Sequence, residues 1–277
     1  MIIHEIDNWD SLRKELFETK KRAIKEGSTE YAQLKLYSGH KDIKWKLQSK
    51  LERQFDGSNF QDQELNVKKM NQNSNWSFES VGKAILNQFK QNLVRISSEY
   101  ENISDDEAMI LGRHHDLSTP ILDWTTNPLK ALFFALEEPY LGYTYNFPTY
   151  NLHIMHDDKP FVVFKLNCYN DIFNDDEFKI IQSINEIGSR MHAQSAWLTE
   201  LRTNDYVCLE DYLEDIGKGD YLEKFIIDSK LIKEIIFHLH ESEISAFSMY
   251  PDLKGAALDA NTNMIGKYSL NQITKNS

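Results

Sequence analysis

Two separated stretches of the sequence carry side chains that could do chemistry. The first is YSGH at residues 37–40, and the second is RHHDLSTPILDWTTNP at residues 113–128. Imidazole exchanges protons near neutral pH, and a carboxylate can orient an imidazole or bind a cation. His114, His115 and Asp123 are therefore candidates for acid–base work. The alternative for Asp123 is structural, because an aspartate at that place can hydrogen-bond backbone groups ahead of the next helix.

The spacing of these residues argues against several common classes of site. A zinc site would need ligands one helical turn apart or a paired Cys-x-x-Cys, and the two histidines are adjacent while the two cysteines are isolated. We predict no metal, so a metal-dependent nuclease is the weakest of three hypotheses. Ser38 lies in no G-x-S-x-G elbow, and the chain has no glycine-rich dinucleotide or P-loop motif.

Hydrophobic periodicity and capping residues predict the elements that position these side chains. We expect a strand over Ile2–Ile6, helices over residues 8–27, 78–96, 105–113 and 127–136, and strands over 31–40, 151–157 and 160–167. Residues 225–239 indicate a strand, a turn or short helix, and a further strand. Residues 65–70 favour a helical turn within a polar excursion, and residues 244–261 a helix-to-turn closure. The class is therefore α+β, with a helix-rich first half and a mainly antiparallel sheet in the second half of one domain, residues 1–277.

Composition and charge limit the partners and the location of the chain. Its 277 residues carry a net charge of -12, but residues 1–100 hold 17 Lys and Arg against 14 Asp and Glu. The remainder holds 14 Lys and Arg against 29 Asp and Glu. If the chain binds a polyanion, we therefore expect it to bind through the N-terminal part. The alternative is that the run Lys20–Lys25 is the solvated face of a helix. With no signal peptide, no membrane-spanning run and two isolated cysteines, we expect a cytoplasmic protein that contacts no membrane.

Four segments together resemble the FRG-domain family, which is named for a (Phe/Tyr)-Arg-Gly motif. LYSGHKDIKWKLQSKLER is similar to the family's opening stretch, and RHHDLSTPILDWTTNPLKALFFA to its most distinctive one, with His114, Thr119, Leu122, Asp123, Trp124, Thr125, Asn127 and Pro128 in place. RMHAQSAWLT, with Arg190 and Gln194, and YPDLKGAA resemble the later segments. The matched region is residues 31–257, preceded by a strand and helix extension over 1–30.

The chain departs from the family pattern where arginines are usual. Ser38 stands at the naming Arg, Pro120 at the Arg of the central segment, Asp116 at a usual Gly and Arg113 at a usual Gln. Arginine binds phosphate through two parallel hydrogen bonds, which a serine hydroxyl cannot do. If the family binds a phosphorylated ligand, Arg53, Arg113 and Arg190 are the substitutes in this chain.

The resemblance implies a function and a site. A Tyr-Arg-Gly strand is also similar to the first motif of one class of ADP-ribosyltransferases, so the fold is expected to be ADP-ribosyltransferase-like and the ligand a nucleotide such as NAD. Transfer of ADP-ribose in a bacterial antiviral-defence or toxin setting is then the leading hypothesis. Catalysis would fall to His114, Asp123 and Tyr37, with Glu241 and Glu243 as candidates for an assisting carboxylate. The ligand would be bound by Ser38, Gly39, His40, Arg53, Arg113, Trp124, Arg190 and Gln194.

The loss of both motif arginines keeps a second hypothesis open. A catalytically degenerate FRG domain could act as a sensor or neutralising module that binds a protein or a nucleic acid. Under either hypothesis, Trp45, Trp124 and Trp197 could line a pocket that binds a base or another ring. The alternative is that these tryptophans belong to the hydrophobic core. Whether NAD is a substrate here is left open by the sequence.

Overall fold

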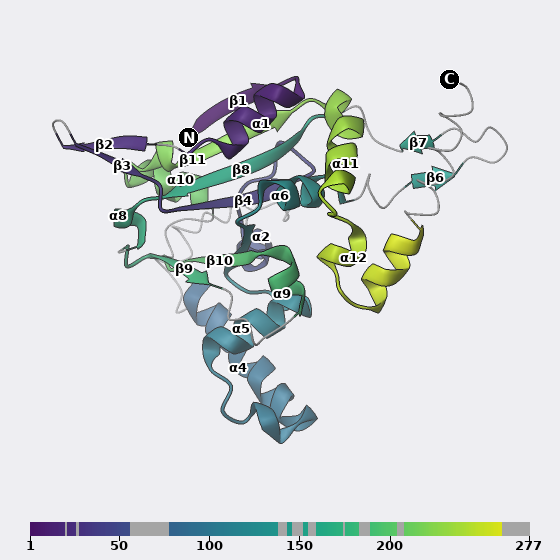
Figure 1. Cartoon of the computed structure of the whole chain (residues 1–277). Helices are drawn as coiled ribbons and strands as arrows, with labels where there is room; N and C mark the ends of the chain where they lie inside the picture. The colour runs from purple at the N-terminus through teal and green to yellow at the C-terminus, as the bar shows by residue number, and fades with distance from the viewer. Residues whose placement is uncertain are drawn as a thin grey trace, which may run out of the picture.

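The fold is a seven-stranded mixed sheet with helices on both faces (Figure 1). The computed structural model describes residues 1–19, 21–25, 28–55, 78–137, 143–145, 152–154, 159–173, 175–182, 189–203 and 208–261. The helical turn predicted at residues 65–70 lies outside these ranges. The sheet strands are β1 (Ile2–Ile6), β4 (Leu34–His40), β5 (Ile121–Thr125), β8 (Phe161–Cys168), β9 (Phe178–Gln182), β10 (Ala196–Leu201) and β11 (Leu222–Ile227).

The strand order is β1-β11-β8-β4-β5-β10-β9. Only β1 and β11 run parallel, and every other neighbouring pair is antiparallel. The α+β class with a mainly antiparallel sheet is therefore confirmed. The division into a helical first half and a sheet second half describes the chain less well, because β1, β4 and β5 come from the first half.

Helices cover both faces of this sheet. They are α1 (Trp9–Phe17), α2 (Lys50–Phe55), α4 (Phe78–Ile96), α5 (Asp105–His114), α6 (Pro128–Ala135), α8 (Asn170–Phe173), α9 (Ser189–Gln194), α10 (Leu209–Asp215), α11 (Ile232–Glu241) and α12 (Ala246–Met249), followed by a helix over 253–261. Short 3-10 turns lie at Ser98–Tyr100, Gly219–Tyr221 and Ser229–Leu231. One core joins α1, α6 and α11 to the sheet, and a second fills the opposite face.

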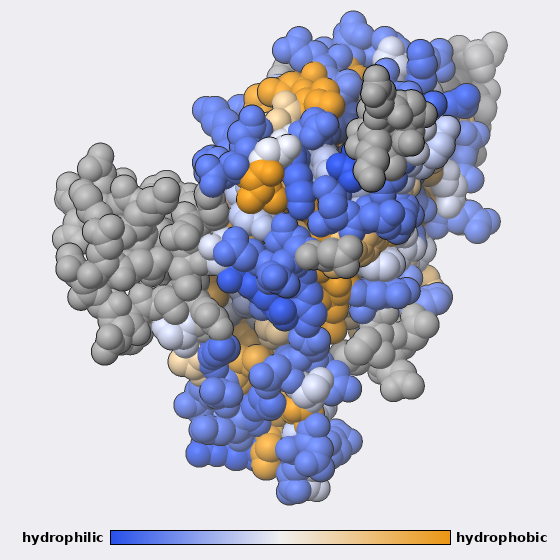
Figure 2. Space-filling view, turned by 90° about the vertical axis from the view of Figure 1, so that its left-hand side faces the viewer, coloured by the Kyte–Doolittle hydropathy of each residue, from blue (hydrophilic) through white to orange (hydrophobic). Residues whose placement is uncertain are grey.

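A third core lies under β5, β9 and β10, where α4, α5 and α9 pack. In Figure 1 the α4–α5 pair lies at the bottom, away from α1 and α11. The face shown in Figure 2 is mostly hydrophilic with separate apolar patches, some of them over this lower part. On α4, Val94 and Ile96 are 40% and 77% exposed. No helix in the described ranges has the length and apolar content needed to cross a bilayer.

Local signals fixed several elements as predicted. β1, α4 and α5 occupy the expected ranges, and Ser104 caps α5 with a reciprocal Ser104–Glu107 capping box. Asn127 accepts a hydrogen bond from the Leu129 amide at the start of α6, and Pro128 occupies its first turn. α5 and α6 begin where the sequence predicted because a capping side chain bonds to backbone groups within the first turn of its own helix.

Two predicted elements are wrong. The helix expected to run to Gly27 ends at Phe17, and Lys21–Lys25 forms β2, a strand paired with β3 (Ser28–Tyr31) in a separate hairpin. Arg22 of β2 is bound to Glu30 and Asp171, so the basic run is no helical face, and part of it is tied to the body.

The strand expected near the end of residues 225–239 is also wrong, because this segment is helix α11. Ile232, Ile235, Ile236 and Leu239 are buried on one side of it. Their i, i+3, i+4, i+7 spacing outweighs the strand preference of the isoleucines, because it gives one continuous apolar stripe to bury. Of the strand expected over 151–157, Leu152–Ile154 forms β7, paired with β6 (Tyr143–Tyr145), and the rest lies outside the described ranges.

Candidate functional site

A cavity opens where two central strands of the sheet separate. β4 pairs with β8 from Leu34 to His40, but it pairs with β5 only at Tyr37 and Thr125. Beyond that pair β4 and β5 diverge, and their backbone and side chains line a cavity of about 400 Å³. Pockets for small ligands usually hold about 300–1,000 Å³ and combine apolar walls with a few polar groups. This cavity has that size and that composition, so it is the candidate site.

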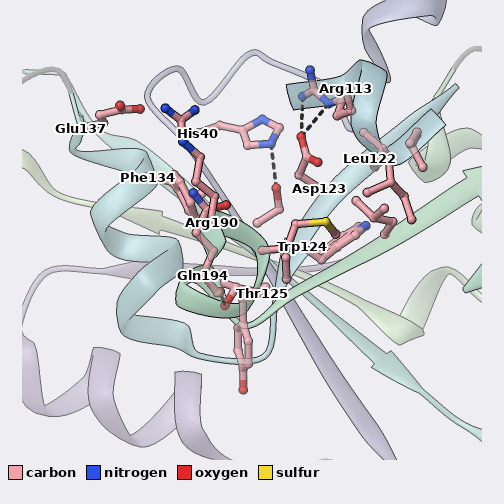
Figure 3. Close-up of a pocket in the computed structure, with 18 of the residues that line it drawn as sticks. His40, Arg113, Leu122, Asp123, Trp124, Thr125, Phe134, Glu137, Arg190 and Gln194 are labelled. Carbon is pink, nitrogen blue, oxygen red and sulfur yellow. Dashed lines mark hydrogen bonds and ion pairs between the residues drawn. The ribbon is translucent and has the colours of Figure 1, made fainter. Parts of the chain in front are cut away.

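Both sequence stretches that could do chemistry meet at this cavity. Its lining includes the candidates Tyr37, Ser38, Gly39, His40, Arg53, Arg113, Asp123, Trp124, Arg190 and Gln194. Figure 3 shows His40, Arg113 and Asp123 on one side of the cavity and Arg190 and Gln194 on another. The side chain of His114, the remaining candidate, lies outside the described part of the chain, although its backbone ends α5. His115, next along the chain, is exposed.

Gly39 is in the wall for a steric reason. A Cβ built on Gly39 would lie 1.8 Å from the carbonyl oxygen of Ala131 and 2.9 Å from the backbone nitrogen of Ala135. The backbone of α6 therefore touches the backbone of β4 at this point. Only glycine permits this approach, so the Gly of YSGH sets how deeply α6 packs against the sheet.

Asp116 explains a second glycine position of the family pattern. Its φ is 64°, in the left-handed region where glycine is favoured and aspartate is among the better-tolerated residues. The turn at Asp116 separates α5, which ends at His114, from β5. Lys50 Nζ donates to the Asp116 carbonyl oxygen at 2.6 Å and lies 3.2 Å from its carboxylate. This turn lets Arg113 of α5 and Asp123 of β5 face each other.

Three guanidinium groups line the cavity, each from a different helix. Arg113 donates from Nε to Asp123 Oδ2 at 2.9 Å and also from Nη2. Arg53 of α2 donates to the carbonyl oxygen of Gln48 at 2.9 Å. Desolvation by burial lowers the pKa of Arg53, and the nearby positive charge of Arg113 adds to this effect. The two cations repel each other, which favours an anion between them.

Arg190 belongs to the opposite wall. Its Nε donates to Asp252 Oδ2 at 2.6 Å, and its guanidinium lies 5.5 Å from the centre of the Tyr250 ring. The Tyr250 hydroxyl donates to Glu137 Oε1 at 2.7 Å. These contacts join α9, the end of α6 and the turn before the last described helix. Glu137 and Tyr250 line the cavity and were not among the predicted site residues, although Tyr250 begins the segment YPDLKGAA.

Three of the predicted residues have structural partners. The Tyr37 hydroxyl donates to the Leu16 carbonyl oxygen at 2.9 Å, and burial raises the pKa of that phenol. The Trp124 indole donates to Thr199 Oγ1 at 2.8 Å with 3% of the residue exposed, so its ring belongs to the core. Gln194 Nε2 donates to the Met249 carbonyl oxygen at 3.1 Å. These three residues form the wall, and their polar ends are directed to protein atoms.

The backbone ahead of α6 is held by Thr125 rather than by Asp123. Thr125 Oγ1 donates to the Gln194 carbonyl oxygen at 2.7 Å and accepts from the Asn127 amide at 3.1 Å. The structural role considered for Asp123 therefore falls to Thr125, two residues later, and Asp123 is bound to Arg113 with 51% of its side chain exposed.

His40 presents a neutral imidazole to the site. Its Nε2 lies 3.2 Å from Ser38 Oγ, while its Nδ1 is buried and has no hydrogen-bond partner among the described residues. Burial lowers the pKa of His40 to about 4, helped by the charges of Arg53 and Lys224. The ring is therefore uncharged at neutral pH and can exchange hydrogen bonds without adding charge.

Other predicted groups lie elsewhere. Glu241 and Glu243 do not line the cavity and sit at the exposed end of α11. Cys168 and Cys208 are both free and buried. Within the ranges that the structure describes, no group of three or more His, Cys, Asp or Glu side chains gathers in a way that could hold a metal ion.

Comparison with known proteins gives one match. Residues 33–141 match the family model of the FRG domain. No curated protein and no solved structure matches the chain. The matched residues supply β4, α2, α5, β5 and α6, which line one side of the cavity, and also Glu137, which is bound to Tyr250 on the other side. Arg190, Gln194 and Tyr250 on the other side come from beyond the matched range.

Proposed function

We propose that the protein binds a nucleotide such as NAD in the cavity between β4 and β5, whose lining comes in large part from residues 33–141, the range that matches the FRG-domain family model. The observation that carries this proposal is the convergence of Arg53, Arg113 and Arg190 on one cavity although both motif arginines are absent. Phosphate groups are the ligands that clustered guanidinium groups favour, because each can make two parallel charge-assisted hydrogen bonds.

The carboxylates of the site make this binding weak in the unaltered chain. Arg113 is already bound to Asp123, and Arg190 to Asp252. A phosphate must compete with these carboxylates for the guanidinium groups. If it binds beside an existing pair instead, its negative charge is repelled by the carboxylate. Arg53 Nη1 donates to the carbonyl oxygen of Gln48, and the positive charge of Arg113 is close enough to lower the pKa of Arg53. An anion between two such cations is stabilised by both, so we assign the diphosphate of the nucleotide to the space between Arg53 and Arg113.

Calorimetric titration with ADP and NAD tests this assignment. We expect Arg113→Gln to weaken binding roughly 10- to 100-fold, since a charge-assisted hydrogen bond contributes about 1.5–3 kcal/mol. Asp123→Asn should strengthen binding about fivefold, because it removes a competing charge worth about 1 kcal/mol near solvent. Arg202→Gln is the matched control, since Arg202 is paired with Glu200 and does not line the cavity. Equal affinities in all four proteins would refute the assignment.

The proposal extends to transfer of ADP-ribose, with an ADP-ribosyltransferase-like fold. In that reaction the bond from ribose C1′ to nicotinamide breaks, nicotinamide leaves with the electron pair, and an acceptor forms the new bond to C1′ while it loses a proton. Positioning and stabilisation of the developing cation at C1′ would be the protein's contribution. Release of nicotinamide from NAD, followed by chromatography, measures this step directly. We propose that this transfer reaction acts in defence or as a toxin activity, in the cytoplasm.

A second candidate function is a catalytically degenerate domain that senses or neutralises a partner protein or nucleic acid. It is favoured by the contacts of two of the proposed catalytic groups, because the Tyr37 hydroxyl is bound to Leu16 and Asp123 to Arg113. Nucleotide binding without any release of nicotinamide would favour this candidate over transfer. Both candidates share the binding site, so the titrations above come first.

A further inference from the structure

One tryptophan near the cavity is not used by the core. Trp45 lies in the segment between β4 and α2, and 49% of it is exposed, whereas Trp124 is 3% exposed. A large aromatic ring that is half exposed gives up hydrophobic stabilisation that burial would supply. An exposed ring beside a binding cavity offers a flat apolar face to a ligand.

The position of this ring is fixed relative to the cavity. The rings of His40 and Trp45 have their centres 6.3 Å apart, at an angle of 62°. His40 lines the cavity, and its imidazole points into it in Figure 3. The turn that carries Trp45 is held by two hydrogen bonds to Asp42, from the Trp45 amide at 3.1 Å and the Lys44 amide at 2.8 Å. Trp45 therefore stands next to the cavity on the His40 side, on an ordered turn.

Lysine side chains lie close to Trp45 on a turn that also holds Asp42, although the whole chain is acidic. Lys41 Nζ lies 5.7 Å from the centre of the Trp45 ring, and Lys44 is exposed beside it. Lys224 Nζ donates to the carbonyl oxygen of Ile43, in the same segment as Trp45, at 2.6 Å, and its charge also reaches His40. An aromatic face with lysines around it is the combination that binds the base and phosphate of a nucleotide, because stacking and charge act together.

We propose that Trp45 is the base-stacking residue of this site, so that the nucleobase lies on its indole ring while the phosphates reach the cavity near Arg53 and Arg113. This inference rests on the proposed nucleotide binding and adds where the base lies. The size of the cavity agrees with it. A volume of about 400 Å³ is near the lower end for ligand pockets. A dinucleotide such as NAD extends beyond such a cavity, and its second nucleoside needs a surface at the rim.

Calorimetric titration with ADP and with inorganic pyrophosphate separates base recognition from phosphate recognition. We expect Trp45→Ala to bind ADP roughly 5- to 150-fold more weakly than the unaltered chain, as loss of one base–aromatic stack implies, and pyrophosphate with unchanged affinity. Trp45→Phe keeps an aromatic face and should recover most of the affinity for ADP. Tyr31→Ala is the matched control, because Tyr31 is 57% exposed on β3 and does not line the cavity.

Each outcome decides the inference. Equal ADP affinity in the unaltered chain and in Trp45→Ala would overturn it while leaving nucleotide binding intact. Parallel loss of ADP and pyrophosphate binding in Trp45→Ala would also overturn it, because the residue would then support the cavity rather than contact the base. If the unaltered chain binds neither ligand, the proposed function itself fails, and this inference fails with it.

Discussion

Replacing Gly39 with alanine tests whether the close contact between β4 and α6 sets the shape of the cavity. The added methyl carbon would lie 1.8 Å from the Ala131 carbonyl oxygen, about half of an ordinary contact distance. Neither side can move easily. β4 is held by β8 along its length, and Ala131, Leu132 and Ala135 of α6 are at most 1% exposed.

The size of the effect follows from what must give way. Overpacking a core lowers the free energy of unfolding by about 1–3 kcal/mol. Because the added methyl group in Gly39→Ala would collide with backbone atoms, we expect a loss of about 3 kcal/mol or more. For a chain of this size that corresponds to a fall in Tm of roughly 6–12 °C, at about 2–4 °C per kcal/mol. Denaturant unfolding followed by circular dichroism measures the loss, and thermal melting gives an independent value.

Gly82→Ala is the control for Gly39→Ala. Gly82 lies in α4, and its added methyl carbon would meet only the flexible end of Leu51, at 3.3 Å. Alanine is favoured over glycine in a helix by up to about 1 kcal/mol, so this variant should be neutral or slightly more stable. A loss below about 0.5 kcal/mol in Gly39→Ala would refute the steric argument. The glycine would then have to be explained by contact with a ligand.

Two further predictions concern side chains of the cavity. Ser38→Arg restores the motif arginine in the cavity that Arg53 also lines. We expect this variant to bind NAD about tenfold to a few hundredfold more tightly by calorimetry, since charge-assisted bonds replace one neutral bond. Tight binding by the unaltered chain with no gain in the variant would show that serine is no loss. His40 has a pKa of about 4 in the folded protein, so the unfolded chain, with an ordinary value near 6.5, binds more protons between these pH values. The contribution of His40 to the free energy of unfolding is therefore complete above about pH 6.5 and falls by roughly 3 kcal/mol as the pH is lowered to 4. It is measured as a pH-dependent difference in the free energy of unfolding between the unaltered chain and His40→Gln. The comparison with the variant is needed because Glu52, whose pKa burial raises to about 7, gives the opposite slope between about pH 4.5 and 7; a difference that stays constant with pH would contradict the assignment to His40.

The sequence by itself determined the elements whose signals are local. Caps and helical periodicity placed α4, α5 and α6, and alternating or dense apolar runs placed β4 and β8. Segment resemblance predicted the match to the FRG-domain family model, and it pointed to ten of the residues that line the cavity. The single-domain boundaries, the absence of a metal and the cytoplasmic location remain predictions.

Local signals failed where distant contacts outweighed them. Lys21–Lys25 looked like the end of a helix, but Arg22 contacts Glu30 and Asp171 and lies over the ring of Tyr221, 4.8 Å from its centre. Asp171 is 149 residues away from Arg22 in the sequence and Tyr221 is farther still, so no local window around Arg22 contains these two partners. The same limit applies to the ion pair between Arg190 and Asp252, which fixes the far wall of the cavity.

Only the tertiary structure decided that the two sequence stretches share one cavity and where that cavity opens. The cavity exists because β4 pairs fully with β8 but meets β5 at a single residue pair, and sheet pairing depends on strands that are far apart in the sequence. The same packing buries Trp124 and leaves Trp45 half exposed beside His40. Residue type is the same for both tryptophans, so their different roles follow from how much apolar surface their neighbours can cover.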